Sequence, residues 1–208
     1  MLTIGFVTGT EPGKWFRRYE QLEGARLSTS PAPDPFPLLA AGEADAVLMR
    51  LPDARVGEEH HVVRLYDEAR GVAVPKDSVY AEVGEEVSPD DIADEHLNHD
   101  FYTEPDVDAL RAALQVVAAN VGVAVAPLPL LKTLSKKQVV PLPLAAVGDE
   151  HGTEIALVWL KSRDADDVQD FVGITKGRTP RSSRGTAKKE KPKSSQVTRN
   201  RKKRRHTR

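Results

Sequence analysis

Short apolar runs alternate with segments of helical periodicity along most of this chain. The first run, Leu2–Val7, has the length and composition of a buried strand. A helix is predicted to follow it, because Trp15, Phe16, Tyr19 and Leu22 fall on one face at helical spacing. We expect Thr10 to cap this helix and Gly24 to end it.

The same alternation continues to about residue 171. The most regular helix is predicted from about Asp106 to Asn120, with Val107, Leu110, Leu114 and Val117 on one face. Strands alternating with helices indicate an α/β fold with a mainly parallel sheet. Further strands are predicted at Ala25–Thr29, Ala44–Leu51, His61–Tyr66 with Gly71–Val74, Gly122–Ala126 and Glu154–Leu160, and further helices around Leu38–Ala41, after Ser88 and at Asp164–Phe171.

Charge divides the chain near residue 176. Residues 176–208 contain 15 Lys/Arg and one acidic residue, Glu190, whereas residues 1–175 contain 15 Lys/Arg and 30 Asp/Glu. The basic segment has Val197 as its only large aliphatic residue, so it cannot bury enough apolar area to offset the entropy of ordering its backbone. We therefore expect a folded acidic domain over 1–175 and a disordered basic tail over 176–208.

Composition excludes several kinds of chemistry. The chain has no cysteine, so disulfides, thiolate metal sites and cysteine nucleophiles are ruled out. It has neither a nucleophile elbow nor an H-E-x-x-H motif, and Gly9-x-x-x-Gly13-Lys14 departs from phosphate-loop spacing. No apolar stretch approaches the roughly 20 residues that span a bilayer, and the first strand lacks the positive flank of a signal peptide. We expect a soluble cytoplasmic protein that is not an enzyme and needs no cofactor.

Two histidine-containing segments carry metal-type ligands. His96 and His99 have Asp94, Glu95 and Asp100 as neighbours, but the segment is predicted to be a solvated loop, and a structural metal site normally needs four well-placed ligands. Glu59-His60-His61 is a weaker candidate, because adjacent residues of a strand point to opposite faces. We expect no metal site at either place.

Several segments, taken in order, resemble the effector-binding domain of LysR-type transcriptional regulators. The most characteristic is Val116–Pro127, a helix that runs through a glycine into a strand and a proline. The other matching pieces are Thr3–Thr10 for the opening strand and turn, Gly42–Leu48 for a short helix and strand, Leu65–Pro75 for a crossing strand, and Glu154–Leu160 for the returning strand.

This resemblance implies a two-lobed α/β fold like that of type 2 periplasmic binding proteins, with a small-molecule cleft between the lobes. Lobe I would comprise about residues 1–70 and 150–175, and lobe II about residues 71–149. In the family, the positions of Thr8, Gly9 and Thr10 face the cleft and hold an anionic effector, and Thr103 lies where second-lobe contacts occur. The simpler alternative is that Thr10 only caps a helix and Gly9 only forms a tight turn.

The resemblance also bears on partners. The family normally has a winged helix-turn-helix before this domain, and this sequence starts at the domain's first strand; the second-lobe segment before Asp106 is also shorter than usual. The domain commonly forms homodimers, in which residues 14–22 and 25–29 would meet residues 106–120 of the partner. The implied function is non-enzymatic sensing of a small molecule, with a regulatory role tied to transcription.

The basic tail supports a second hypothesis. Its cations could neutralise nucleic-acid phosphates without sequence preference, although it lacks aromatic residues that would stack on bases. The protein would then be a nucleic-acid-associated interaction protein whose cleft has lost ligand binding. A third reading is that the tail folds back on the acidic body. The candidate nucleic-acid-binding residues are Lys188, Lys189, Arg199, Arg201, Lys202, Lys203, Arg204 and Arg205.

Overall fold

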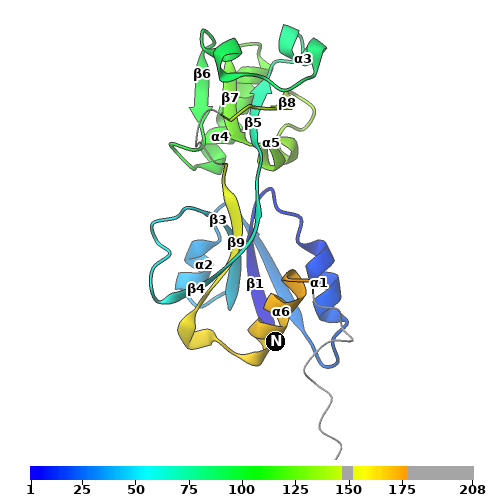
Figure 1. Cartoon of the computed structure of the whole chain (residues 1–208), viewed down its shortest axis with the longest axis vertical. Coiled ribbons are helices and arrows are strands. Elements are labelled where there is room, and N and C mark those ends of the chain that lie inside the picture. The colour runs from blue at the N-terminus through cyan, green and yellow to red at the C-terminus, as the bar shows by residue number, and fades with distance from the viewer. Residues whose placement is uncertain (147–151, 178–208) are drawn as a thin grey trace, which may run out of the picture.

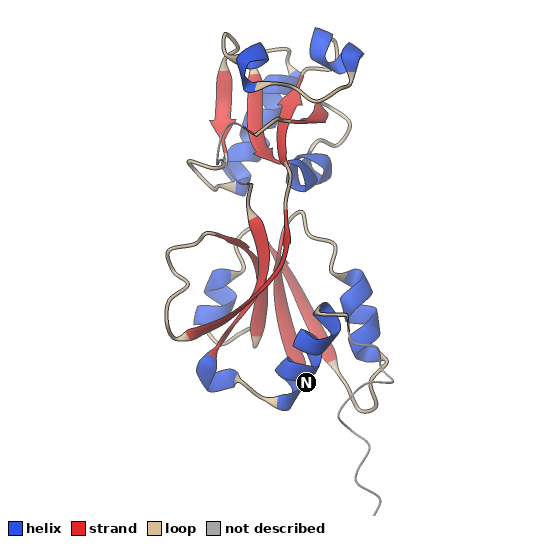
Figure 2. Cartoon of the chain, viewed as in Figure 1, coloured by secondary structure: helices blue, strands red, loops and turns tan. Residues whose placement is uncertain are grey.

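Two lobes follow one another along the long axis of the molecule, and each is built on its own β-sheet (Figures 1 and 2). The structure is a computed structural model, and it describes residues 1–146 and 152–177. The five-stranded sheet has the order β2-β1-β3-β9-β4 and the four-stranded sheet the order β6-β7-β5-β8. We call the lobe of the five-stranded sheet lobe I and the other lobe II.

Lobe I buries both faces of its sheet. Strand β1 (Leu2–Val7) lies parallel to β2 (Leu27–Ala32) and β3 (Ala46–Leu51). Strand β9 (Glu154–Leu160) is antiparallel to β3 and to the edge strand β4 (His60–Asp67). Because side chains of a strand alternate between faces, Leu48 joins the core beneath α1 (Gly13–Glu20) and α6 (Asp166–Thr175), and Met49 joins the core beneath α2 (Phe36–Ala40).

Lobe II also has a core on each face of its sheet. Strand β5 (Arg70–Val74) lies between β7 (Val123–Pro127) and β8 (Val140–Pro143) and is antiparallel to both, while β6 (Leu97–Asp100) pairs parallel to β7. Helices α4 (Val107–Ala118) and α5 (Leu128–Leu134) share one core with the sheet. Residues of α3 (Val79–Val83) and of the 3-10 helix η1 (Pro89–Ile92) pack with the core of the opposite face.

Two strands cross from one lobe to the other (Figure 1). Strand β4 continues into β5 through Glu68 and Ala69, and β9 returns from lobe II to lobe I. The two crossing segments are paired, since Asp67 lies opposite Glu154 and the Glu68 N–H donates to the Thr153 carbonyl at 2.8 Å. We call residues 67–70 and 152–154 the hinge.

Several predicted elements are confirmed by the structure. Strands β1 and β9 have the predicted bounds, and α4 occupies most of the predicted Asp106–Asn120 helix. Asp106 caps α4, because its carboxylate accepts from Asp108 N at 2.7 Å and Ala109 N at 3.0 Å. Ser88 starts a helix as predicted, with a capping box completed by Asp91.

The start and end of α1 were predicted wrongly. The N-cap residue of α1 is Pro12, not Thr10, and no side chain caps the helix. The Thr10 hydroxyl instead donates to the Val7 carbonyl at 2.7 Å, which closes the turn after β1. The helix also ends at Glu20 and not at Gly24.

The other errors concern pairings between distant residues. The His96–Asp100 segment was predicted to be a loop, yet residues 97–100 form β6, because parallel pairing with β7 supplies its backbone hydrogen bonds. Antiparallel partners of β3, β4, β5 and β9 make both sheets mixed and not mainly parallel. Helix α5 was not predicted. Within the described residues, no helix is long and apolar enough to cross a membrane.

Candidate functional site

A cleft of about 610 Å³ opens between the two lobes next to the hinge. Lobe I contributes the ends of β1 and β3 and the loops that follow β2 and β3. Lobe II contributes the segment that connects β6 to α4, and the hinge contributes Gly152 and Thr153. The cleft is lined by Val7, Pro33, Asp34, Pro35, Met49, Arg50, Pro52, Asp53, Ala54, Arg55, Phe101, Tyr102, Pro105, Gly152 and Thr153.

A buried ion pair connects lobe I to the hinge at the base of this cleft. Arg50, at the end of β3, donates from Nε to Glu68 Oε2 at 2.7 Å and from Nη2 to Glu68 Oε1 at 3.0 Å. The Arg50 side chain is 8% exposed and that of Glu68 is fully buried. Two charges at this depth are tolerated only when each is paired and hydrogen-bonded, which the bidentate geometry provides.

The ion pair is extended by two further hydrogen bonds. The Thr153 hydroxyl donates to Glu68 Oε2 at 2.7 Å, so both crossing segments are attached to the same carboxylate. Arg50 Nη1 donates to the Thr8 carbonyl at 2.9 Å, which ties the turn after β1 to the same network. Gly152 permits this close approach, because a Cβ atom at that position would lie 2.1 Å from the Glu68 carbonyl oxygen.

Two aromatic residues of lobe II face this network. The Arg50 guanidinium carbon lies 5.8 Å from the centroid of the Phe101 ring, and that of Arg70 lies 4.6 Å from the Tyr102 ring. The Tyr102 hydroxyl is buried with no hydrogen-bond partner in the described part of the chain. Burial raises the pKa of this phenol, so it stays protonated and keeps an unused donor.

An ion-pair cluster forms the outer rim of the cleft. Arg55 contacts Asp34 through Nη1 at 2.6 Å and Asp53 through Nη2 at 2.6 Å, and its guanidinium carbon lies 4.6 Å from the centroid of the Phe36 ring. The hydrogen bonds from Arg55 lower the pKa of the Asp53 carboxyl. They also raise the pKa of Arg55 itself. Both loops of lobe I that border the cleft are thereby joined to each other.

The turn formed by Thr8, Gly9 and Thr10 does not line this cleft. The Thr8 hydroxyl donates to the Ala32 carbonyl at 3.4 Å, and the Thr10 hydroxyl is committed to Val7. Gly9, with φ of +94°, lies against lobe II, since a Cβ atom there would be 2.8 Å from Arg50 Nη2 and 3.1 Å from Leu130 Cα. Gly9 instead lines a separate groove of about 530 Å³ with Tyr66, Pro129, Lys132 and other residues.

The second-lobe residue Thr103 is exposed, and its hydroxyl donates to the Asp100 carbonyl at 3.0 Å. Its neighbours Phe101, Tyr102 and Pro105 line the cleft, whereas Thr103 does not. Ligand binding by Thr8, Gly9, Thr10 and Thr103 stays a prediction. The candidate residues of the tail lie outside the described residues.

Sequence reasoning missed Arg50, Glu68 and Thr153. One signal was present: Arg50 is the only charged residue inside the apolar run Ala46–Leu51. A cation within a buried strand needs a carboxylate partner, but the partner comes from a distant segment that the pattern does not identify.

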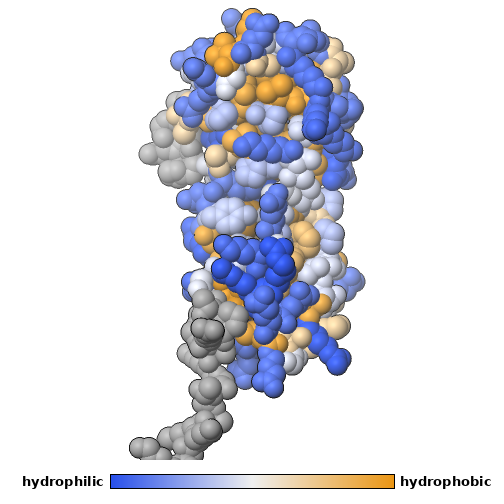
Figure 3. All heavy atoms as spheres, turned by 90° about the vertical axis from the view of Figure 1, so that its right-hand side faces the viewer, coloured by the Kyte–Doolittle hydropathy of each residue, from blue (hydrophilic) through white to orange (hydrophobic). Residues whose placement is uncertain are grey.

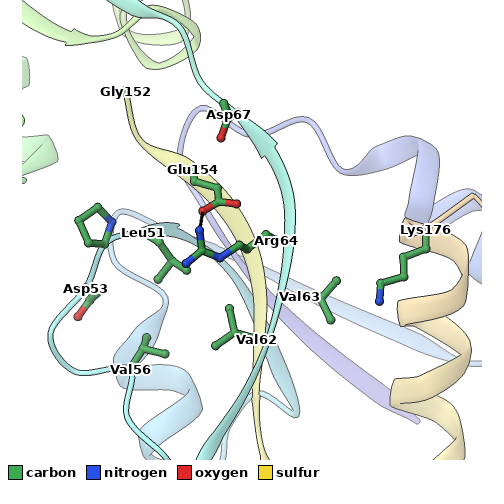
Figure 4. A pocket seen from close by; sticks show the side chains of 11 residues that line it. Leu51, Asp53, Val56, Val62, Val63, Arg64, Asp67, Gly152, Glu154 and Lys176 are labelled. Atoms are coloured by element: carbon green, nitrogen blue, oxygen red, sulfur yellow. Dashed lines mark hydrogen bonds and ion pairs between the residues drawn. The ribbon is translucent and has the colours of Figure 1, made fainter. Parts of the chain in front are cut away.

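A further groove, of about 950 Å³, lies between β4 and the loop that follows β3 (Figure 4). Val56 and Val62 supply apolar surface, and Arg64 crosses the groove to pair with Glu154 at 2.9 Å. Lys176 of the C-terminal end of α6 lies on the other side of β4. Within the described residues, no group of three or more His, Asp or Glu side chains is placed to hold a metal ion.

The fold is shared with solved domains of known regulators. The effector-binding domain of a BenM variant aligns with a TM-score of 0.64 at 17% identity, over 84% of this chain and 92% of that one. The effector-binding domain of QuiR in complex with shikimate aligns with a TM-score of 0.62 at 15% identity, over 84% and 94%. The chain has the fold of a LysR-type effector-binding domain.

A third match has different coverage. A Corynebacterium glutamicum OxyR C206 mutant aligns with a TM-score of 0.62 at 18% identity, over 84% of this chain but 62% of that one. The present chain therefore spans less than two thirds of that regulator. No protein-family model and no curated protein sequence matches the chain.

The buried ion pair generates the first prediction. Glu68→Gln removes the charge that compensates Arg50 while keeping the shape of the side chain, so it should lower the free energy of unfolding by about 3 kcal/mol. Arg64→Ala is the matched control: it breaks an ion pair whose arginine is 74% exposed, and it should cost less than about 1 kcal/mol. Urea unfolding of both variants measures the difference. Equal effects would show that Arg50 does not depend on Glu68.

Proposed function

We propose that this chain is a non-enzymatic, small-molecule-sensing domain with a regulatory role. The observation that carries the proposal is the 610 Å³ cleft between two lobes that are joined by a paired hinge. Clefts of this size suit small organic molecules. The solved domains with this fold are effector-binding domains of transcription regulators, and one of them contains shikimate. A link of the present chain to transcription is part of the proposal.

The composition of the cleft suggests the class of ligand. Most of its wall is apolar, with Val7, Met49 and Phe101 among several prolines, whereas the charged groups lie at the base and the rim. Arg50 has five N–H groups, and the hydrogen bonds to Glu68 and Thr8 use three of them. The two others provide donors for a carboxylate. We therefore propose a compact organic anion with an apolar body.

Binding in this cleft would bias the position of the lobes. A ligand that contacts Arg50 on one side and Phe101 or Tyr102 on the other is bound more tightly when the lobes are close together. Such a difference in affinity is what shifts a conformational equilibrium. The hinge network would transmit the change, because it joins β3 to both crossing segments.

We also propose that residues 1–175 act as one unit and form homodimers. The outer side of α4 exposes Ala112 and Val116, the latter 41% exposed. Helix α1 and strand β2 form the opposite part of the proposed contact. Trp15 and Phe16 of α1 are only partly buried against the core of lobe I.

Ligand binding in the cleft can be tested by placing a large side chain at its entrance. Ala54 is an exposed cleft residue, so Ala54→Trp should block ligand entry without removing an internal contact. Ala41→Trp, at an exposed position outside the cleft lining, is the control. A panel of small carboxylates that includes shikimate and benzoate is screened by thermal shift and confirmed by calorimetry. A ligand present at 100 times its dissociation constant should raise the melting temperature by roughly 5–10 °C.

The cleft proposal predicts that the A54W variant loses this shift and that A41W keeps it. A carboxylate that stabilises both variants equally binds elsewhere and contradicts the proposed site. Absence of any shift across the panel, with neutral analogues active, would contradict the anionic class.

The proposed dimer contact makes a separate prediction. Val116→Arg places a charge on the exposed side of α4 and should convert a dimer into a monomer in light scattering. Because this contact is mainly apolar, the wild-type dimer should persist at high salt. A wild-type chain that stays monomeric at high micromolar concentration contradicts the contact.

The basic tail supports a second candidate function, nucleic-acid binding. Residues 178–208 contain 14 Lys/Arg and one acidic residue, a composition that favours contacts with phosphates. Affinity for duplex DNA should therefore be independent of sequence, with log K falling linearly with log salt at about −0.9 per phosphate neutralised.

Filter binding of the full chain across a salt series measures this slope. The control replaces Arg201, Lys202, Lys203 and Arg204 by Gln, which should reduce the magnitude of the slope. An unchanged slope of log K against log salt, or no binding to DNA or RNA at low salt, would contradict nucleic-acid binding by the tail.

A further inference from the structure

One segment of lobe II carries acidic residues almost without basic ones. Residues 77–108 contain 12 Asp/Glu and no Lys or Arg. In the structure they form α3, η1, β6 and the start of α4, all in lobe II (Figure 1). Glu82, Glu85 and Glu86 are exposed and have no ion-pair partner among the described residues.

Helix α3 of this segment has an exposed apolar pair. Val79 and Val83 are each 67% exposed, and their i, i+4 spacing places them on one side of α3. Tyr80 and Ala81 occupy the other side and pack on the core of lobe II. The two valines are therefore not needed to attach α3 to the lobe.

A shallow groove connects the apolar pair to the acidic side chains. It has a volume of about 270 Å³, and Val87, 4% exposed, lies at its base. Glu85, Glu86 and Asp91 line it together with the two valines. Figure 3 views the molecule from the side on which α3 lies in Figure 1, and shows apolar atoms among hydrophilic ones at the top of lobe II. We call Val79, Glu82, Val83, Glu85, Glu86 and Asp91 the acidic face.

An apolar groove with an acidic border fits a cationic segment that has an aliphatic side chain. The chain itself contains such a segment: residues 178–208 carry 14 Lys/Arg and one large aliphatic residue, Val197. Their charge is opposite to that of the acidic face, and electrostatic complementarity of this kind selects partners and speeds association.

We propose that the acidic face binds the basic segment 178–208 of a second copy of this chain. The segment begins after α6, which belongs to lobe I, whereas α3 lies at the far end of lobe II (Figure 1). To reach the acidic face of its own chain, it would have to extend past lobe I and the hinge. A second copy presents the face without this stretching cost.

This contact would be independent of the cleft and of the proposed effector. Nucleic acid and the acidic face would compete for the same cations, because both bind them through negative charge. Assembly of the chain would then be controlled by polyanions and by ionic strength.

The test measures binding of a fluorescent synthetic peptide of residues 178–208 to the full chain at low salt by anisotropy. Glu82→Gln with Glu85→Gln and Glu86→Gln should weaken binding about tenfold, because three charge contacts are lost. The control removes three exposed acids of lobe I, Glu20, Glu23 and Glu43, and should change affinity by less than about twofold. Val79→Ser with Val83→Ser should also weaken binding, which a purely diffuse attraction would not predict.

Two results would overturn the proposal. An equal loss of peptide affinity in the lobe I control and in the acidic-face variant would mean that binding depends only on the net charge of the protein. Protection of residues 178–208 from trypsin that does not depend on protein concentration would place the segment on its own chain. In light scattering, the expected association through the acidic face disappears at high salt, which separates it from the apolar dimer contact.

Discussion

The ion pair between Arg50 and Glu68 is the interaction on which the arrangement of the two lobes depends. Three segments that are distant in sequence meet there: the end of β3, the segment from β4 to β5, and the segment that leads into β9. Because both charges are buried, neither partner can leave without a large cost in free energy. The hinge therefore has a defined geometry although it consists of two narrow crossing strands.

The character of the cleft follows from this constraint. With Glu68 neutralising Arg50, the base of the cleft has little net charge but retains two guanidinium donors. The exposed rim also contains compensated charges, because Arg55 forms ion pairs with Asp34 and Asp53. Between these charged layers the wall is apolar. The proposed sensing of a small molecule requires a site of this kind, in which shape and one polar group are recognised.

Charge acts at a second level, over the whole chain. The acidic residues are concentrated between residues 77 and 108, and the basic residues after residue 177. Opposite charges on one polypeptide attract each other unless another polyanion intervenes. The separation of charge therefore links the two proposed activities of the chain, self-association and binding to nucleic acid.

The sequence by itself determined the elements whose signals are local. Strand β1, strand β9 and helix α4 were predicted because their apolar periodicity lies within the element. Strands β6 and β8 contain four residues each and depend on hydrogen bonds to β7 and β5, so no local pattern marks them. Thr10 looked like a helix cap, but its hydroxyl is taken by Val7. The position of Arg50 in an apolar strand signalled a buried charge, while its partner, Glu68, was decided only when the tertiary structure brought the hinge against β3.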